Sequence, residues 1–530
     1  MNPWKVIEQC YRKYCSKPLK ITFCSACITG ILAHLFALTN VINNYDSITQ
    51  IPKGVGTTLP SGRWLLMLIE KLQNWLWDTY SVPFWNGLIS ILLLAVTACV
   101  VTNIFQIQNT LNCILTGAIM VVFPAITSMM FFMYTAPHYS LAILLSVLAV
   151  YFSNKKWLGS LIAVVCCVCA LGIYQAYLPL TVGLMVTFLL WKMLRNEADW
   201  KTTILRGIKY LILLAGSLWV YMKILNAMMA HYGIGLSNYQ GVNHMGKLSL
   251  QQIPLLLKKV YRIFFHLSNE NYYGMNSTII VQRSIWFLGI LSVVAAVYFW
   301  IAYRRKFIER LMIVVLFMMI PVAVGSIEIM CSESKIYTLM IYGMVVVYLI
   351  PILLLELWED RKLAATAISV WHKKWSHYLR GITAWGISIF LLLISVNYIW
   401  SSNVNYTLTY YATLETQEYL ASMMTRMRDT EGYSPFAPVA FIGKDVQDPT
   451  YDNVWGGTPV TYGGTGSNFV NSYSRNRFFN HLLSYNYIQA EPAQIETLKQ
   501  TKEVKDMPCY PSDGSIKMID GTLVVKLSND

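Results

Sequence analysis

The chain has 530 residues, of which 55% are hydrophobic and only 13% are charged. Soluble globular domains carry about 25% charged residues, so this chain lacks the polar surface that several soluble domains would need. Its formal net charge of +14 would suit a nucleic-acid partner. The Lys and Arg residues, however, lie in short clusters between apolar runs, which is typical of membrane-flanking charge. The composition therefore predicts an integral membrane protein with no nucleic-acid partner.

Eleven apolar stretches of roughly the length that a bilayer crossing requires recur along the chain. They predict a polytopic all-α membrane protein with about eleven transmembrane helices, and the fourth stretch is short for a full crossing. In this interpretation no ionisable residue falls at the middle of a span. The stretches are Ile21–Ile42, Phe84–Ile104, Leu111–Phe132, Tyr139–Phe152, Trp157–Ile173, Ala176–Trp191, Ile204–Leu225, Ile285–Ile301, Leu311–Ile329, Ile336–Leu355 and Ile382–Trp400.

The positions of Lys and Arg between the spans predict the orientation. If the N-terminus is cytoplasmic, the inner segments carry 21 Lys and Arg residues, whereas the outer loops before the tail carry nine. Because positive residues favour the cytoplasmic side, we expect a cytoplasmic N-terminus and, with eleven spans, an extracytoplasmic C-terminus. The loops Asn43–Pro83 and Asn226–Ser284 and the tail Ser401–Asp530 then face outward.

The tail differs in character from the rest of the chain. We expect two domains, a transmembrane domain over residues 1–400 and a small extracytoplasmic α/β domain over residues 401–530. Turn-rich stretches in the tail separate two strand-like runs from two helix-like ones, namely Pro438–Ile442, Thr522–Leu527, Leu408–Arg428 and Ala493–Lys505.

The first outer loop contains a helical pattern of its own. Apolar side chains recur there at spacings of three and four residues, which predicts an amphipathic helix lying in the membrane interface rather than another crossing. Such a helix would hold the preceding part of the loop at the membrane surface. The pattern comprises Leu65, Leu68, Ile69, Leu72, Trp75 and Leu76.

Two residues of the same loop could carry chemistry. Asp46 follows the first span beside Tyr45, and a carboxylate there can accept a proton from a bound hydroxyl group. Arg63 follows Gly62, and an arginine fork suits a phosphate through two hydrogen bonds. The plainer interpretation is that Asp46 caps the loop and that Arg63 only extends its charge into water beside Trp64.

Other polar residues gather at the outer ends of the spans: Lys223, Glu328, Glu333, Lys335, His138 and the pair Tyr174-Gln175. Ordinary anchoring at the interface is the alternative role for each. Proton-coupled transporters place carboxylates or histidines near mid-membrane, so a polar rim favours an enzyme. The outer histidines lack metal-ligand spacing, and the cysteines imply no disulfide framework.

Short motifs at both ends and in the middle of the chain resemble the Gtr-type glucosyltransferases, polytopic enzymes that decorate bacterial O-antigen and related surface glycans. Their order along the chain and their common sidedness make the resemblance stronger than any one motif does. The motifs are Asn44-Tyr45-Asp46, Gly62-Arg63, Gly172–Leu178, and in the tail Tyr510–Ile516 and Val524–Leu527.

The resemblance implies a class C glycosyltransferase of the bacterial inner (plasma) membrane. Such an enzyme moves a hexose, usually glucose, from a polyprenyl-phosphate carrier to a hydroxyl of a surface glycan on the extracytoplasmic side. Asp46 would be the general base, and Arg63 would contact the carrier phosphate. The further substrate-binding candidates are Lys335, Lys223, Tyr45, Tyr174, Gln175, His138 and Glu333.

One position departs from the family pattern. We expect an arginine in the outer loop before the tenth span, and the chain has Lys335 there. The second cation for the phosphate is therefore open between Lys335 and Lys223, and Arg262 or Arg283 could also serve. A divalent metal is compatible with this chemistry, although the sequence offers no convincing set of ligands for one.

Two other classes of protein compete with this prediction. A transporter or flippase of lipid-linked sugars would show polar residues at mid-membrane, paired repeats or broken helices, and a small tail. A glycan polymerase or ligase would also use a large outer loop with arginines, but Asn226–Ser284 contains only Arg262 and Arg283.

Overall fold

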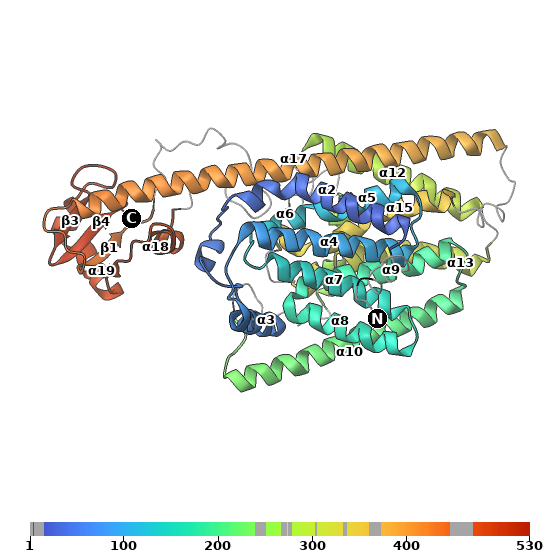
Figure 1. Ribbon diagram of the computed structural model, residues 1–530, viewed down its shortest axis with the longest axis horizontal. Helices are drawn as coiled ribbons and strands as arrows, with labels where there is room; N and C mark the ends of the chain where they lie inside the picture. Colours follow the sequence, from blue (N-terminus) through green and yellow to red (C-terminus); the bar gives the residue numbers. More distant parts are fainter. Residues whose placement is uncertain are drawn as a thin grey trace. The chain divides into compact units, whose positions relative to one another are not determined.

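The computed structural model describes residues 4, 15–238, 251–266, 273, 278–302, 305–331, 336–359, 373–445 and 470–529. The chain divides into two compact units (Figure 1). Unit 1 comprises Met1–Thr39 and Val55–Asn403, and unit 2 comprises Asn40–Gly54 and Val404–Asp530. The long helix α17 (Lys373–Arg428) belongs to unit 1 up to Asn403 and to unit 2 beyond it.

Unit 1 is built from helices, several of them long enough to cross a membrane. In the described part of the chain, eight helices have the length and apolar character of a membrane span, or nine if the bent pair α5–α6 counts as one. The principal helices are α2 (Lys17–Thr39), α4 (Pro83–Phe105), α5 (Thr110–Val122), α6 (Pro124–Met130), α7 (Ala136–Ser153), α8 (Trp157–Ile173), α9 (Leu178–Leu194), α10 (Trp200–Tyr232), α12 (Ile279–Ala302), α13 (Phe307–Val324) and α15 (Val345–Glu359).

These helices confirm the prediction of a polytopic all-α membrane protein, since each of the eleven apolar stretches overlaps a helix. The count of full-length spans is lower because two stretches form shorter apolar helices, at Trp157–Ile173 and Tyr342–Trp358. A third stretch is bent by 44° between α5 and α6. The bend lies at Phe123, which is extended as residues before a proline prefer, and Pro124 starts the new helix.

One expectation about the spans is wrong. His34 lies well inside α2 and is completely buried, so an ionisable residue does occur within a span. Its Nε2 lies 3.0 Å from the carbonyl oxygen of Val121 in the last turn of α5. A hydrogen bond of this kind satisfies a buried imidazole, and His34 therefore ties two helices together.

Side-chain contacts group the helix ends of unit 1 into two sets. At one end, Arg195 donates to the side chain of Gln106 at 2.8 Å, and Arg305 donates to the carbonyl oxygen of Leu194 at 2.6 Å. The buried carboxylate of Glu356 also lies there, and we call this set the Glu356 end. The opposite ends of the helices, with the loops between them, form the Arg63 end, which contains most of the predicted site residues of unit 1.

Short helices complete the Arg63 end. Helix α3 (Trp64–Leu76) confirms the helix predicted in the first outer loop. Its buried residues include Trp64 and Met67, whereas Leu72 and Trp75 of the predicted apolar stripe are exposed. The exposed stripe is what a helix in the membrane interface requires. The other short helices are η2 (Leu59–Ser61), η3 (Gln175–Tyr177), α11 (Ile253–Phe265) and α14 (Ser326–Met330).

Unit 2 is an α/β module with a four-stranded sheet in the order β2-β1-β4-β3. Strand β1 pairs in parallel with β2 and β4, and β3 pairs antiparallel with β4. The predicted strands at Pro438–Ile442 and Thr522–Leu527 correspond to β1 and β4. The elements are β1 (Pro438–Ile442), α18 (Ser472–His481), β2 (Ile488–Gln489), α19 (Pro492–Gln500), α20 (Lys502–Asp506), β3 (Ile516–Ile519) and β4 (Thr522–Lys526).

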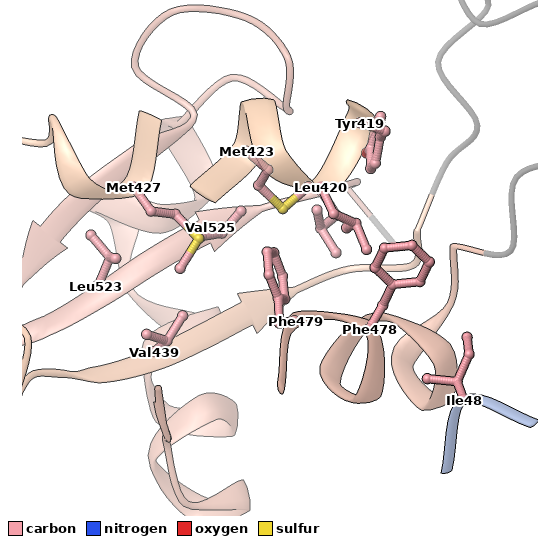
Figure 2. Packing of buried hydrophobic residues seen from close by; sticks show 11 residues of the cluster. Ile48, Tyr419, Leu420, Met423, Met427, Val439, Phe478, Phe479, Leu523 and Val525 are labelled. Atoms are coloured by element: carbon pink, nitrogen blue, oxygen red, sulfur yellow. The ribbon is translucent and has the colours of Figure 1, made fainter. Parts of the chain in front are cut away.

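Alternation along the central strands gives the sheet two apolar faces. Val439 and Val525 join a core with Phe478 of α18 and Met423 of α17 (Figure 2). The alternate residues of the strands, such as Ala440 and Val524, join a second core with α19 and α20. The sheet of unit 2 is therefore covered by helices on both sides.

The first of these cores includes a residue from the other end of the sequence. Ile48, in the short helix η1 (Ser47–Gln50), is completely buried against this core, and η1 contacts α18 (Figure 2). The start of the first outer loop is thus an integral part of unit 2.

Candidate functional site at the Arg63 end

The backbone turn that presents Arg63 depends on a glycine. Helix η2 ends at Ser61, and Gly62 follows in the left-handed conformation with φ of +75°. This conformation costs an L-residue with a Cβ roughly 1–2 kcal/mol. Gly62 donates its N–H to the carbonyl oxygen of Leu59 at 2.9 Å, and the chain then enters α3 with Arg63 as the N-cap residue.

Two side chains from other helices hold this turn. The amide nitrogen of Gln175 donates to the carbonyl oxygen of Ser61 at 2.9 Å and to the hydroxyl of Tyr221 at 2.8 Å. The hydroxyl of Tyr221, on α10, donates in turn to the carbonyl oxygen of Gly62 at 2.9 Å. We call this set of three hydrogen bonds the Gln175–Tyr221 clamp. A Cβ on Gly62 would lie only 2.6 Å and 2.7 Å from the two clamping atoms, so the turn has room for glycine alone.

The guanidinium group of Arg63 lies against aromatic rings. Its carbon is 4.9 Å from the ring centroid of Tyr174 and 5.8 Å from that of Tyr139. These two rings stack with centroids 4.4 Å apart, and Tyr177 packs edge-on against both. Together with Tyr134, these three tyrosines form what we call the tyrosine cage, and all four interact electrostatically with Arg63.

In the described part of the chain, no carboxylate pairs with this cation. The Nη1 atom of Arg63 donates to the carbonyl oxygen of Thr57 at 3.2 Å, while its buried Nε has no hydrogen-bond partner. Burial lowers the pKa of Arg63, but the combined effect of the four tyrosines is larger and raises it. The net shift of the pKa is therefore upward, and the group stays charged. The positive N-terminus of α7 also begins beside the cage, because Tyr139 lies in its first turns.

Arg63 is half-buried and its Nε is fully buried without a partner, and a cation withdrawn from water in this way is costly without an anion beside it. The arrangement is therefore suited to an anion that comes from outside the protein. An arginine fork binds phosphate oxygens through charge-assisted hydrogen bonds, and the aromatic walls limit access of water to the charge. The Arg63 end can thus act as a phosphate-binding site.

His138 lies on the same side of the bundle. It belongs to the first turn of α7, next to Tyr139, and is buried. Its Nε2 lies 3.0 Å from the Oε1 of Gln73 on α3. The contact joins α7 to α3, so His138 supports the helix that begins with the Arg63 turn.

A buried acid lies nearby on α14. The carboxylate of Glu328 is 2% exposed and forms an ion pair of 2.5 Å with Lys259 on α11, whose side chain is half exposed. Burial, and to a lesser extent Glu328, raise the pKa of the neighbouring Cys331 thiol to about 11, so this thiol is neutral near pH 7. The ion pair docks α11 against α14.

The structure places only some of the residues that the sequence grouped together around Arg63. Arg63, Tyr174, Gln175 and His138 gather at one end of unit 1, whereas Lys223 is exposed on α10 with its Nζ 5.7 Å from the Trp219 ring. Two predicted residues, Glu333 and Lys335, lie outside the described residues.

Asp46 and Tyr45 belong to unit 2. Both are exposed, and the backbone N–H of Asp46 donates to the side-chain oxygen of Asn44 at 3.0 Å. The carbonyl oxygen of Asp46 accepts bonds from the N–H and the hydroxyl of Thr49 at 3.1 Å and 2.7 Å. The local structure thus fixes the backbone at Asp46 and leaves its side chain at the surface.

The sequence did not indicate the roles of two tyrosines at the Arg63 end. Tyr221 and Tyr139 lie within apolar helices, where a tyrosine looks like any interfacial aromatic residue. Only Gly62-Arg63 and the polar pair Tyr174-Gln175 gave a signal in the sequence. Among the described residues, no group of three or more His, Cys, Asp or Glu side chains is placed to hold a metal ion.

The helical fold, with polar side chains gathered around Arg63 at one end, is that of a polytopic membrane protein. A family model, glucosyl transferase GtrII, matches residues 35–348, which is more than half of the chain and includes the whole of the Arg63 turn. The chain therefore belongs to the GtrII glucosyl transferase family and is a membrane glucosyltransferase. No curated protein and no solved structure matches it significantly.

Proposed function

We propose that the protein transfers glucose from a polyprenyl-phosphate carrier to a hydroxyl of a surface glycan, at the extracytoplasmic face of a bacterial inner membrane. The observation that carries this proposal is Arg63, a half-buried cation with aromatic walls and no acidic partner among the described residues. A lipid carrier keeps its phosphate at headgroup depth, where the end of a helix bundle can reach it. The charge distribution of the loops favours the Arg63 end as the outer one.

In this proposal Arg63 acts on the leaving group. When the acceptor hydroxyl attacks the anomeric carbon, the bond to the carrier phosphate breaks and the phosphate gains negative charge. A preorganised cation stabilises that charge more in the transition state than in the ground state. The tyrosine cage keeps the guanidinium group in place and restricts water, which strengthens the interaction.

Asp46 is the proposed general base, which takes the proton from the acceptor hydroxyl. Its backbone is fixed by Asn44 and Thr49, and its side chain is at the surface of unit 2. Tyr45 beside it is the proposed contact for the acceptor sugar. Lys335 and Glu333 remain candidates for substrate binding, and the second cation for the phosphate is Lys335, Lys223, Arg262 or Arg283. A divalent metal is compatible with the mechanism.

The test is transfer of radiolabelled glucose from polyprenyl-phosphate glucose to lipid-linked surface glycan by the purified protein. We expect Asp46→Asn to lower the rate by at least a hundredfold with normal folding, because general base catalysis contributes 10²–10⁴. Asp520→Asn, a surface carboxylate of unit 2 in the β3–β4 turn, is the matched control and should keep full activity. Near-normal transfer by Asp46→Asn would refute the base assignment.

A second outcome separates the transferase from its main competitor. If the wild-type protein moves no glucose in this assay but changes the side on which labelled polyprenyl-phosphate glucose is exposed in vesicles, it is a flippase of lipid-linked sugars. The family match favours transfer.

A further inference from the structure

The Gln175–Tyr221 clamp has a role that no feature of the sequence suggests. It bonds to the backbone carbonyl oxygens of Ser61 and Gly62, and none of its three hydrogen bonds involves the guanidinium group of Arg63. Both donor hydrogens of the Gln175 amide are used within the clamp. Within the clamp the Gln175 amide nitrogen acts on the protein's own backbone and on Tyr221, whereas its side-chain oxygen, which can only accept hydrogen bonds, makes none of these contacts.

The two residues of the clamp hold the turn from two different elements of the fold. Gln175 lies in η3 between α8 and α9, and Tyr221 lies on α10. Tyr221 is 6% exposed, and Gln175 is 7% exposed, so water does not compete for these hydrogen bonds. Two further contacts tie α10 and the residues after it to the same region: Lys71 of α3 donates to the Tyr232 hydroxyl at 2.7 Å, and the N–H of Ser237 donates to the carbonyl oxygen of Pro60 at 2.8 Å.

The direction of Arg63 follows from the clamp. Arg63 comes immediately after Gly62 and is the N-cap residue of α3, without a side-chain capping bond of its own. The backbone carbonyls of Ser61 and Gly62 are the atoms that the clamp holds, so a change there would rotate the Arg63 side chain relative to Tyr174. A small rotation would spoil a two-point contact with a phosphate, because both hydrogen bonds need good alignment.

We propose that Tyr221 and Gln175 are positioning residues, which aim Arg63 at the phosphate of the lipid carrier without touching the substrate. The inference rests on the proposed role of Arg63 in phosphate binding. It assigns a function in donor recognition to α10, a helix in which the sequence singled out only Lys223.

The experiment measures binding of ³²P-labelled polyprenyl phosphate to the full-length protein in detergent micelles. We expect Arg63→Ala to weaken binding at least tenfold. Tyr221→Phe should weaken it about tenfold, because it removes two of the three hydrogen bonds of the clamp, one to the carbonyl oxygen of Gly62 and one from Gln175. Gln175→Met, which keeps the shape but removes the amide, should have a similar effect and serves if the Tyr221 variant does not fold.

A matched control lies on the same helix. Tyr210 is also buried, and its hydroxyl donates to the side chain of Asn154 at 2.7 Å, near the Glu356 end. Tyr210→Phe therefore removes a comparable hydrogen bond from α10 without altering the Arg63 turn. We expect this variant to bind polyprenyl phosphate as the wild type does.

A coupling measurement distinguishes positioning from general support of the fold. If Tyr221 acts only through Arg63, Tyr221→Phe should not lower the affinity for polyprenyl phosphate any further in a protein that already carries Arg63→Lys. The reason is that lysine lacks the planar fork that Tyr221 would aim. Additive losses in the double variant, or equal losses in Tyr221→Phe and Tyr210→Phe, would overturn the inference while leaving phosphate binding by Arg63 intact. Wild-type affinity in Arg63→Ala would instead refute the phosphate site itself, and the positioning role with it.

Discussion

The buried carboxylate of Glu356 provides a sharp test of how unit 1 is held together. It lies in α15 and accepts hydrogen bonds from the backbone N–H of Gln108 at 2.8 Å and from the side-chain nitrogen of Asn112 at 2.7 Å. It also accepts a longer bond from the N–H of Asn109, the N-cap residue of α5. One acidic group thus satisfies the start of α5 and ties it to a distant helix.

The cost of removing this group can be worked out donor by donor. Asn112 is 2% exposed, so in Glu356→Ala its amide loses a partner that water does not replace, at about 1–3 kcal/mol. Gln108 and Asn109 are more accessible, and water compensates for most of their loss. The favourable interaction of a carboxylate with a helix N-terminus adds roughly 0.3–1 kcal/mol. We expect Glu356→Ala to lower the free energy of unfolding by about 3 kcal/mol and Glu356→Gln, which keeps one acceptor oxygen, by about 1 kcal/mol.

The assay is equilibrium unfolding of the purified protein by SDS in mixed micelles, followed by circular dichroism. Glu309 supplies the control, because its carboxylate also caps a helix start, accepting from the N–H of Lys306 at 3.1 Å, but in a more exposed place. Glu309→Gln should cost no more than about 0.5 kcal/mol. Equal unfolding midpoints for Glu356→Ala and Glu309→Gln would refute the reasoning that burial of the partner amide sets the cost.

Two further predictions concern the Arg63 end. Gly62→Ala should weaken polyprenyl phosphate binding at least tenfold, because the new Cβ displaces both clamping atoms. The control is Gly216→Ala on α10, where no other atom lies within 4 Å of the added Cβ, and this variant should bind normally. Equal affinities of the two variants would contradict the close fit at Gly62. Lys259→Met should lower the thermal unfolding midpoint more than the double variant with Glu328→Gln, because the single change leaves a buried carboxylate unpaired. A double variant as unstable as the single one would contradict that explanation.

Hydropathy and charge predicted most of the architecture because the membrane imposes them directly. Each apolar stretch forms helix since backbone groups within a bilayer must bond within their own segment. The break before Pro124 could have been foreseen from the proline, which cannot donate the bond that continues α5. The lengths of α8 and α15 could not, since tertiary packing decides where such helices end.

The candidate site was predictable only in part. Gly62-Arg63 and Tyr174-Gln175 were visible as polar exceptions beside apolar runs, and the structure brings them together. Hydropathy could not reveal that Tyr221 holds the turn, because a hydrogen bond between α10 and a loop 159 residues away in sequence leaves no local pattern. The burial of His34 could not be predicted for a similar reason, because its partner Val121 lies in another helix.

The burial of Ile48 in unit 2 has a consequence for biogenesis. A ribosome delivers residues 40–54 long before Val404, with all of residues 55–403 in between. The segment that carries Asp46 therefore leaves the translocation machinery without its final packing partner, since Phe478 and its neighbours are synthesised last. Because domains usually fold as their chain emerges, unit 2 is an exception whose core closes only after the membrane helices have been inserted. Asp46 thus acquires its native surroundings at the last stage of assembly, and a chain truncated within the tail would carry the membrane helices without the packing partner of the segment that holds Asp46.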